Sequence, residues 1–202
     1  TPKPSSAASD VYKRQDPRSV GVELDRLLPQ DRNVVYDAGN FLQCATYIGV
    51  PGPAHIKQAS DFSSIGMGFG TAMGFAHGDP ERTTVLVIGD GAFLMTLSEL
   101  ETVAREGLRL VVVVMNDCAY GAELHFLKLR NIPISTTQFP DIDYAPVAQA
   151  FGFTAATVRT LDELRALAPL LAAPSGPVLI DCKINAAIPA GFLTEAPAAK
   201  SA

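Results

Sequence analysis

Two oxygen-bearing side chains, Asp90 and Asn116, each follow an apolar run of the chain. The first run, Val85–Ile88, leads into Gly89-Asp90-Gly91, and the second, Val111–Met115, leads into Asn116. Val-rich and Ile-rich runs of this length are typical of buried parallel strands. A carboxylate and a carboxamide at the ends of such strands, with glycines beside them, suit a hard cation that bridges to phosphate.

The segment between these two positions predicts how they meet. It has the apolar spacing of a helix, and a strand–helix–strand unit returns the chain to a neighbouring parallel strand. Asp90 and Asn116 are therefore expected to converge at one edge of the sheet, where open α/β sheets bind ligands. Together they carry one formal negative charge, which suits magnesium that already holds a diphosphate. The backbone N–H groups of Gly91 and Ala92 are expected to point at phosphate oxygens.

The elements that position this pair alternate along the chain. Strands are predicted at 34–36, 84–88, 110–115, 154–158 and 177–182, and helices at 17–28, 71–77, 94–106, 120–130, 143–150 and 161–172. This alternation predicts an α/β fold in three layers, with helices on both faces of a mostly parallel sheet. The helix at 94–106 is expected to bury Leu94 and Leu100, and Glu23 is expected on the solvent side of the first helix.

The composition divides the chain into three parts. Residues 1–16 are small and polar and predict a linker or a non-native leader, residues 17–185 form the predicted domain, and residues 186–202 form an Ala/Pro-rich tail expected on the surface. Residues 49–60 contain Pro51, Gly52 and Pro53 and are expected to form a loop.

Charge and cysteine content exclude several classes of function. The formal net charge is −5 and no run of Lys or Arg occurs, so no nucleic-acid or membrane surface is predicted. No apolar run approaches the length of a membrane span. The cysteines Cys44, Cys118 and Cys182 are scattered without CxxC spacing, which favours a reduced, cytoplasmic setting.

The pair of motifs resembles a known family. Gly89-Asp90-Gly91, followed by a Val-rich strand and Met115-Asn116, resembles the diphosphate motif of thiamine-diphosphate-dependent enzymes, which runs from GDG to NN. Acetolactate synthases and benzoylformate decarboxylase-like enzymes also share the turn at 66–70, the loop at 116–121 and the last strand at 176–181. The resemblance covers residues 17–185 and implies the C-terminal, diphosphate-binding domain of such an enzyme.

The resemblance implies a role for individual residues. Asp90, Asn116 and the backbone carbonyl of Cys118 would bind Mg2+. The diphosphate would be bordered by residues of three loops: Gly39, Asn40, Gly89, Gly91, Ala92, Tyr120 and Gly121. Asn40 is equally suited to cap a helix. The carbonyl of Ile65 would accept a hydrogen bond from the 4′-amino group of thiamine diphosphate, and Met67 would hold the two cofactor rings in their bent shape.

The resemblance also implies a partner, because no segment here is long enough for the family's pyrimidine-binding domain. The glutamate that activates the cofactor belongs to that domain, so no catalytic residue is expected in this chain. The expected function is that of the C-terminal part of an acetolactate synthase-like 2-oxoacid decarboxylase or carboligase, a homodimer or tetramer when complete. The alternatives are a separate subunit of a two-chain, sulfopyruvate-type decarboxylase and a non-catalytic domain that kept the fold. A nicotinamide-binding Rossmann domain is disfavoured, because the first strand ends in Asp37-Ala38-Gly39-Asn40 and not in GxGxxG.

Overall fold

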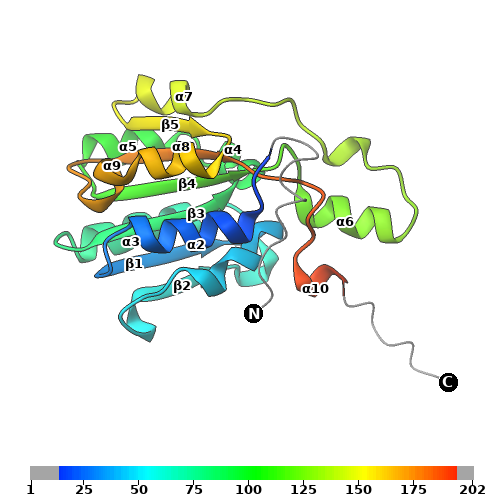
Figure 1. The fold of residues 1–202 in the computed structure, drawn as a ribbon, viewed down its shortest axis with the longest axis horizontal. Coiled ribbons are helices and arrows are strands. Elements are labelled where there is room, and N and C mark those ends of the chain that lie inside the picture. Colours follow the sequence, from blue (N-terminus) through cyan, green and yellow to red (C-terminus); the bar gives the residue numbers. More distant parts are fainter. Residues whose placement is uncertain (1–13, 195–202) are drawn as a thin grey trace.

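The computed structural model describes residues 14–194, which form a six-stranded, all-parallel sheet (Figure 1). The strand order across the sheet is β2-β1-β3-β4-β6-β5. The strands are β1 (Arg32–Asp37), β2 (Ile56–Ala59), β3 (Thr83–Gly89), β4 (Leu110–Asn116), β5 (Thr154–Val158) and β6 (Val178–Lys183). The five predicted strands are confirmed, each within two residues of its predicted bounds.

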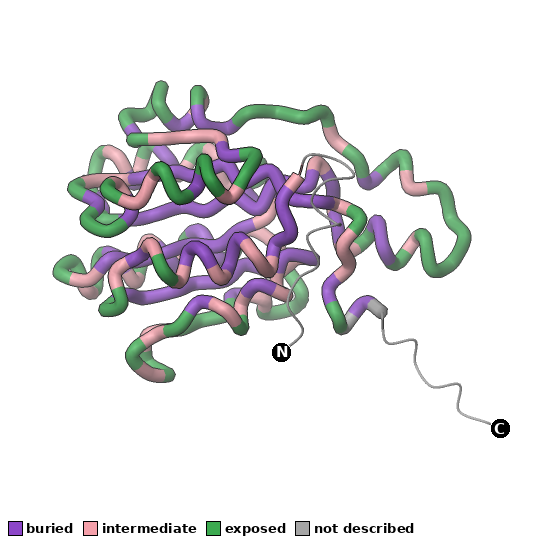
Figure 2. Tube along the Cα trace, viewed as in Figure 1, coloured by how far each residue is buried: buried purple, intermediate pink, exposed green. Residues whose placement is uncertain are grey.

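Helices cover both faces of the sheet, so the predicted three-layer α/β/α fold is confirmed (Figure 1). Along each central strand, successive side chains enter opposite cores: Val87 packs in one cluster and Leu86 in the other. This alternation leaves the middle strands buried on both sides, as Figure 2 shows. One face carries α2 (Pro17–Leu27), η1 (Asn40–Tyr47), α8 (Leu161–Ala166) and α9 (Ala168–Ala172). The other carries α3 (Met67–Gly78), α4 (Asp90–Met95), α5 (Glu99–Arg105) and α7 (Ala145–Ala150).

The remaining elements lie in the connections. α6 (Gly121–Leu129) and η4 (Ser135–Thr137) extend away from the sheet, and α10 (Gly191–Thr194) lies beside α6 (Figure 1). η2 (Pro53–His55) and η3 (Asp61–Ser63) flank β2. The predicted loop at 49–60 thus contains an edge strand of four residues, too short for its periodicity to be recognised. None of the helices between residues 14 and 194 has the length and apolar character needed to cross a bilayer.

Two predicted helices are interrupted. The helix predicted at 94–106 is α4 followed by α5, and Leu94 is 39% exposed instead of buried. The hydroxyl of Thr96 bonds back to the carbonyls of Ala92 and Phe93 at the break. The helix predicted at 161–172 divides at Leu167. Pro169 follows there, and it has no N–H with which to continue the helical hydrogen bonds.

The predicted boundaries need correction at both ends. Asp16 caps α2 by accepting a hydrogen bond from the Arg18 N–H at 2.9 Å, and Gln15 forms a parallel bridge with Ile184. Residues 14–16 therefore belong to the fold and not to a leader. Ala190 and Leu193 are buried, so the surface tail predicted from 186 is wrong as far as residue 194. Residues 1–13 and 195–202 of these predicted segments lie outside the described residues.

Glu23 also differs from its predicted place on the solvent side of α2. It is only 6% exposed, and its carboxylate pairs with Arg165 of α8 at 2.9 Å. α8 packs over this part of α2, which the helical periodicity of α2 alone could not reveal.

Candidate functional site

A cavity of about 40 Å³ lies where β1, β3 and β4 end. It is lined by the loops that follow these strands, as expected for an open parallel sheet. A volume of this size holds roughly three water-sized groups, so it suits a coordinated ion more than a whole organic ligand. Its lining residues are Ala38, Gly39, Asn40, Phe41, Ile65, Gly89, Asp90, Gly91, Ala92, Met115, Asp117, Ala119, Tyr120, Gly121, Ala122 and Glu123.

Asp90 presents an unsatisfied carboxylate oxygen to this region. The residue is 2% exposed and begins α4, and its Oδ1 accepts the Gly91 N–H at 3.0 Å. Its Oδ2 is buried and has no hydrogen-bond partner among the described residues. Burial, followed by the charge of Asp117, raises the pKa of Asp90 to about 8. The Gly91 N–H thus bonds to Asp90 here, and its predicted contact with a phosphate stays a prediction.

Asp117 is the second carboxylate of the cavity. It is 8% exposed, and burial raises its pKa to about 7, although backbone N–H groups, Arg14 and the Asn40 amide partly oppose that shift. Two buried carboxylates that repel each other and leave an oxygen unsatisfied fit a divalent cation with oxygen ligands. Sequence reasoning missed Asp117 as a member of the site.

Asn116 and Cys118, the other two predicted metal ligands, do not line the cavity. The Asn116 amide donates to Asp181 Oδ1 at 2.9 Å and to the Ile142 carbonyl at 3.1 Å. The Cys118 carbonyl accepts the Phe139 N–H at 2.8 Å. Successive side chains of a strand point to opposite faces, so a shift of one residue changes which side chain reaches the cavity. Asp117, one position later, lines the cavity where Asn116 was expected, and the metal ligands stay a prediction.

That shift had a signal in the sequence. Val112 and Val114 face one core of the sheet, and strict alternation places Asn116 on the same side. Asp117 is the first residue beyond the strand, so the alternation does not fix the direction of its side chain. Tracing the alternation to the strand end would have assigned Asn116 to the packed interior.

The other predicted residues gather at the cavity, with one exception. Its lining includes Gly39, Asn40, Ile65, Gly89, Asp90, Gly91, Ala92, Tyr120 and Gly121. Met67 does not line the cavity; it is 41% exposed at the start of α3. Its predicted contact with the cofactor rings stays a prediction.

Two glycines leave room that the site needs. A Cβ on Gly121 would lie 2.5 Å from Asp117 Oδ2, and a Cβ on Gly91 would lie 2.6 Å from the Tyr120 ring. The Tyr120 ring is in turn held by Phe139, edge to face at 4.6 Å between centroids. Both positions therefore require glycine for a steric reason.

Asn40 connects Asp117 to the C-terminal segment. Its amide donates to the carboxylate of Asp117 and to the Ile188 carbonyl at 3.0 Å, and its Oδ1 accepts the Ala190 N–H at 2.7 Å. η1 starts at Asn40 with no side-chain cap, so the predicted helix-cap role is wrong, and the predicted phosphate contact stays a prediction.

Comparison with known proteins identifies the family. The family model described as "Thiamine pyrophosphate enzyme, C-terminal TPP binding domain" matches residues 37–182. The chain belongs to this family. The resemblance inferred from the GDG motif is thus confirmed, and every residue that lines the cavity lies within the matched range.

Relatives of this thiamine pyrophosphate-binding domain include decarboxylases and synthases. The alpha-keto-acid decarboxylase of Mycolicibacterium paratuberculosis is 39% identical over 60% of this chain and 20% of that protein. The acetolactate synthase isozyme 2 large subunit of Escherichia coli is 28% identical over 81% of this chain and 30% of that protein. The chain therefore spans about a third or less of the length of these relatives.

A solved structure supports the fold of the domain. Benzoylformate decarboxylase from Polynucleobacter necessarius superposes with a TM-score of 0.80, at 22% identity, over 92% of this chain and 35% of that chain. At this identity the likeness establishes the three-layer fold alone.

Proposed function

We propose that this thiamine pyrophosphate-binding domain holds Mg2+ between Asp90 and Asp117, and binds the diphosphate of the cofactor through that ion. The observation that carries the proposal is the buried Oδ2 of Asp90, which has no partner among residues 14–194 and lies beside a second buried carboxylate. A buried carboxylate is either paired with a cation or protonated. A single divalent ion would neutralise the negative charges of both carboxylates.

The carbonyl of Ala119 is the third ligand in this proposal. Ala119 forms an antiparallel bridge with Gln138, in which the flanking residues Cys118 and Tyr120 make the hydrogen bonds. In this pattern the peptide groups of the central residue point away from the partner segment. Ala119 also lines the cavity, so its carbonyl replaces that of Cys118 in the predicted ligand set.

The remaining cofactor contacts follow from the cavity wall. Gly39, Gly89, Tyr120 and Gly121 would border the diphosphate, since each lines the cavity around Asp90 and Asp117. Ile65 lines the same cavity, which supports its carbonyl as the acceptor for the 4′-amino group. The bound cofactor supplies an electron sink for a carbanion next to a carbonyl.

We infer that the domain acts on small 2-oxoacids as part of an acetolactate synthase-like decarboxylase or carboligase. The names of its relatives support this reaction class. The pyrimidine-binding domain would supply the activating glutamate, either fused or as a separate subunit, in a homodimer or tetramer. A two-chain, sulfopyruvate-type decarboxylase and a non-catalytic domain are the alternatives.

Calorimetric titration of the chain with Mg2+ and inorganic pyrophosphate tests the cation site. Asp90→Ala and Asp117→Ala are each expected to abolish Mg2+-dependent binding, because each removes one of two carboxylate ligands. Asp162→Ala removes an exposed carboxylate on α8 and should leave the affinity unchanged. Unchanged affinity in Asp117→Ala would contradict the assignment of Asp117.

A further inference from the structure

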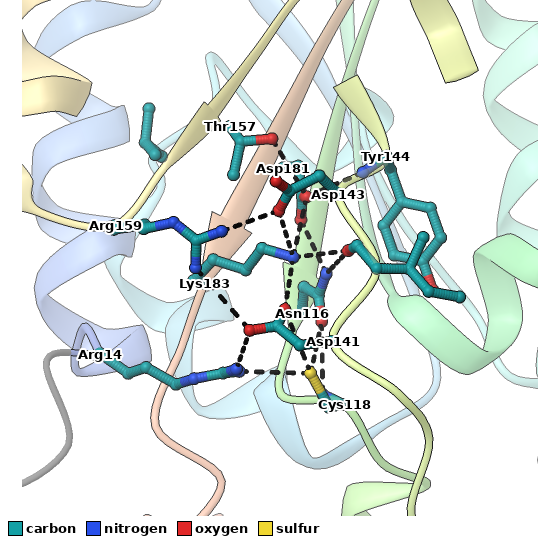
Figure 3. A network of polar contacts seen from close by, with 12 residues as sticks. Arg14, Asn116, Cys118, Asp141, Asp143, Tyr144, Thr157, Arg159, Asp181 and Lys183 are labelled. Atoms are coloured by element: carbon teal, nitrogen blue, oxygen red, sulfur yellow. Dashed lines mark hydrogen bonds and ion pairs between the residues drawn. The ribbon is translucent and has the colours of Figure 1, made fainter. Parts of the chain in front are cut away.

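A polar network lies beside the proposed cation site, and the buried Lys183 is its centre (Figure 3). The Lys183 side chain has 0% exposure at the end of β6. Its ammonium lies 2.8 Å from Asp141, 3.1 Å from Asp143 and 3.2 Å from Asp181. It also donates to the Ile142 carbonyl at 2.5 Å. A buried charge with this many oxygen partners fixes the groups around it.

Lys183 shares two of its partners with Asn116. The Asn116 amide donates to Asp181 Oδ1 at 2.9 Å and to the Ile142 carbonyl at 3.1 Å. Lys183 bonds the same carbonyl and the other oxygen of the Asp181 carboxylate. Each acceptor that holds the Asn116 side chain is therefore itself held by Lys183.

Asp181 extends the network to two further elements. Its carboxylate is fully buried and accepts the Tyr144 N–H at 3.0 Å and the Thr157 hydroxyl at 3.3 Å. Asp181 thereby joins β6 to β5 and to the start of α7. Such a buried carboxylate requires a compensating charge, which Lys183 supplies.

The position of Asn116 determines the shape of the turn that follows. Its Oδ1 accepts the Cys118 N–H at 3.3 Å, which closes the turn across Asp117. Cys118 has φ of +59°, in the left-handed region that non-glycine residues rarely adopt. With Asn116 held inward and the turn closed, Asp117 is directed into the cavity with Asp90.

We propose that Lys183 and Asp181 are positioning residues for the cation site, and that they act by holding Asn116 so that Asp117 faces the cavity. The inference rests on the proposed function, because it takes Asp117 as a ligand of the cation. Neither residue lines the cavity, so their effect on the cation is indirect.

The variants must separate positioning from stability. Lys183→Met alone leaves Asp181 buried without a compensating charge, which is expected to destabilise the fold. The double variant Lys183→Met/Asp181→Asn removes both charges and avoids that defect. An asparagine at 181 offers one acceptor oxygen where the carboxylate offers two, and the Ile142 carbonyl loses its ammonium partner. Asn116 is thus less constrained in a chain that is expected to fold.

The test is calorimetric titration with Mg2+ and inorganic pyrophosphate, at a temperature where circular dichroism shows every variant folded. The double variant is expected to bind about 10- to 100-fold more weakly than the wild-type chain, the range found when groups that orient metal ligands are removed. Its urea midpoint is expected to lie above that of the single variant, because no buried charge is left uncompensated.

The matched control removes a similar pair far from the site. Glu23→Gln/Arg165→Met deletes the ion pair between α2 and α8, and its affinity should equal that of the wild type. Wild-type affinity in the Lys183→Met/Asp181→Asn variant would overturn the inference alone. Absence of binding by the wild-type chain would overturn the proposed function and the inference with it.

Discussion

Asp90 and Asp117 lie in an environment unlike that of ordinary surface carboxylates. Burial raises the pKa of Asp90 to about 8 and that of Asp117 to about 7, and each charge disfavours the other. Without a cation the pair is most stable when it retains protons. A divalent ion would displace them, so binding of the ion and release of protons are linked.

This linkage predicts how stability depends on pH. The ordinary pKa of these groups is 3.8, so between about pH 4 and about pH 8 the folded chain binds more protons than the unfolded chain. The free energy of unfolding of the cation-free chain should therefore fall as pH rises through this window, by at most about 1.4 kcal/mol per pH unit for each group. Urea unfolding in the presence of a chelator measures this slope.

The control for this prediction is Asp90→Asn, which cannot ionise at this position. Its slope should be shallower than that of the wild type, and saturating Mg2+ should also remove most of the slope of the wild type. A slope that Asp90→Asn leaves unchanged would show that other groups cause the pH dependence.

A second prediction for a single residue concerns the space around Gly121. Gly121→Ala would place its Cβ 2.5 Å from Asp117 Oδ2 and 2.9 Å from the Asn40 Cβ. Because both neighbours are buried, the carboxylate must move, and the Mg2+–pyrophosphate affinity should fall about tenfold or more. Gly70→Ala is the control, since nothing lies within 4 Å of that added carbon. Equal affinities in the two variants would contradict the steric argument.

At the residue scale, the sequence predicted most of the cavity wall but named Asn116 where Asp117 lines the cavity. Glycines and an aspartate after an apolar run identify the end of β3 without any knowledge of packing. The alternation along β4 assigns Asn116 to the packed interior, but its hydrogen-bond partner Asp181 lies 65 positions away along the chain. No local pattern identifies that partner.

At the scale of elements, Asp37 joins the end of β1 to the start of α3. Its buried carboxylate accepts the N–H groups of Gly66 at 2.9 Å and Gly68 at 2.7 Å. Gly66 has φ of +91°, which glycine adopts without strain. The carboxylate thus satisfies the first N–H groups of α3 in place of a capping residue and sets the position of Ile65.

Asp37→Ala should therefore destabilise the fold through α3. It leaves buried N–H groups without an acceptor, and the expected loss is about 1–3 kcal/mol in the free energy of unfolding. Urea unfolding of Thr160→Ala gives the comparison, because Thr160 caps α8 at an exposed site and its loss should cost about 1 kcal/mol or less. A smaller loss for Asp37→Ala than for Thr160→Ala would contradict this account.

The elements themselves were largely predictable. Buried parallel strands are continuous apolar runs, and β3, β4 and β6 were recognisable for that reason. β2 was not, because three of its four residues are exposed at the sheet edge. The break between α4 and α5 follows from a hydroxyl that bonds the backbone, which apolar periodicity does not report.

At the scale of the whole molecule, the proposed cation site lies at one edge of the sheet, and the rest of the cofactor would lie outside it. The cavity of about 40 Å³ accommodates an ion, and the chain spans 20% to 35% of the relatives described above. The bulk of thiamine diphosphate must therefore contact surface beyond this cavity. The pyrimidine-binding domain is the proposed source of that surface.

The isolated chain is accordingly expected to show no decarboxylase or carboligase turnover of 2-oxoacids, even with saturating Mg2+ and thiamine diphosphate. The group that activates the cofactor is expected on the partner domain. Assays of product formation, with and without an added pyrimidine-binding domain, measure this. Turnover by the pure chain would reveal an activating acid within these 202 residues.

The bonds of Asn40 couple the proposed cation site to the C-terminal segment at 188–190. One amide contacts the Asp117 carboxylate and the backbone at Ile188 and Ala190. Any ligand that immobilises Asp117 favours the ordered form of that segment. Ordering the segment raises the affinity for the ligand by the same factor. The amide proton of Ala190 is then a remote reporter of cation occupancy, and its exchange with solvent slows as the site fills.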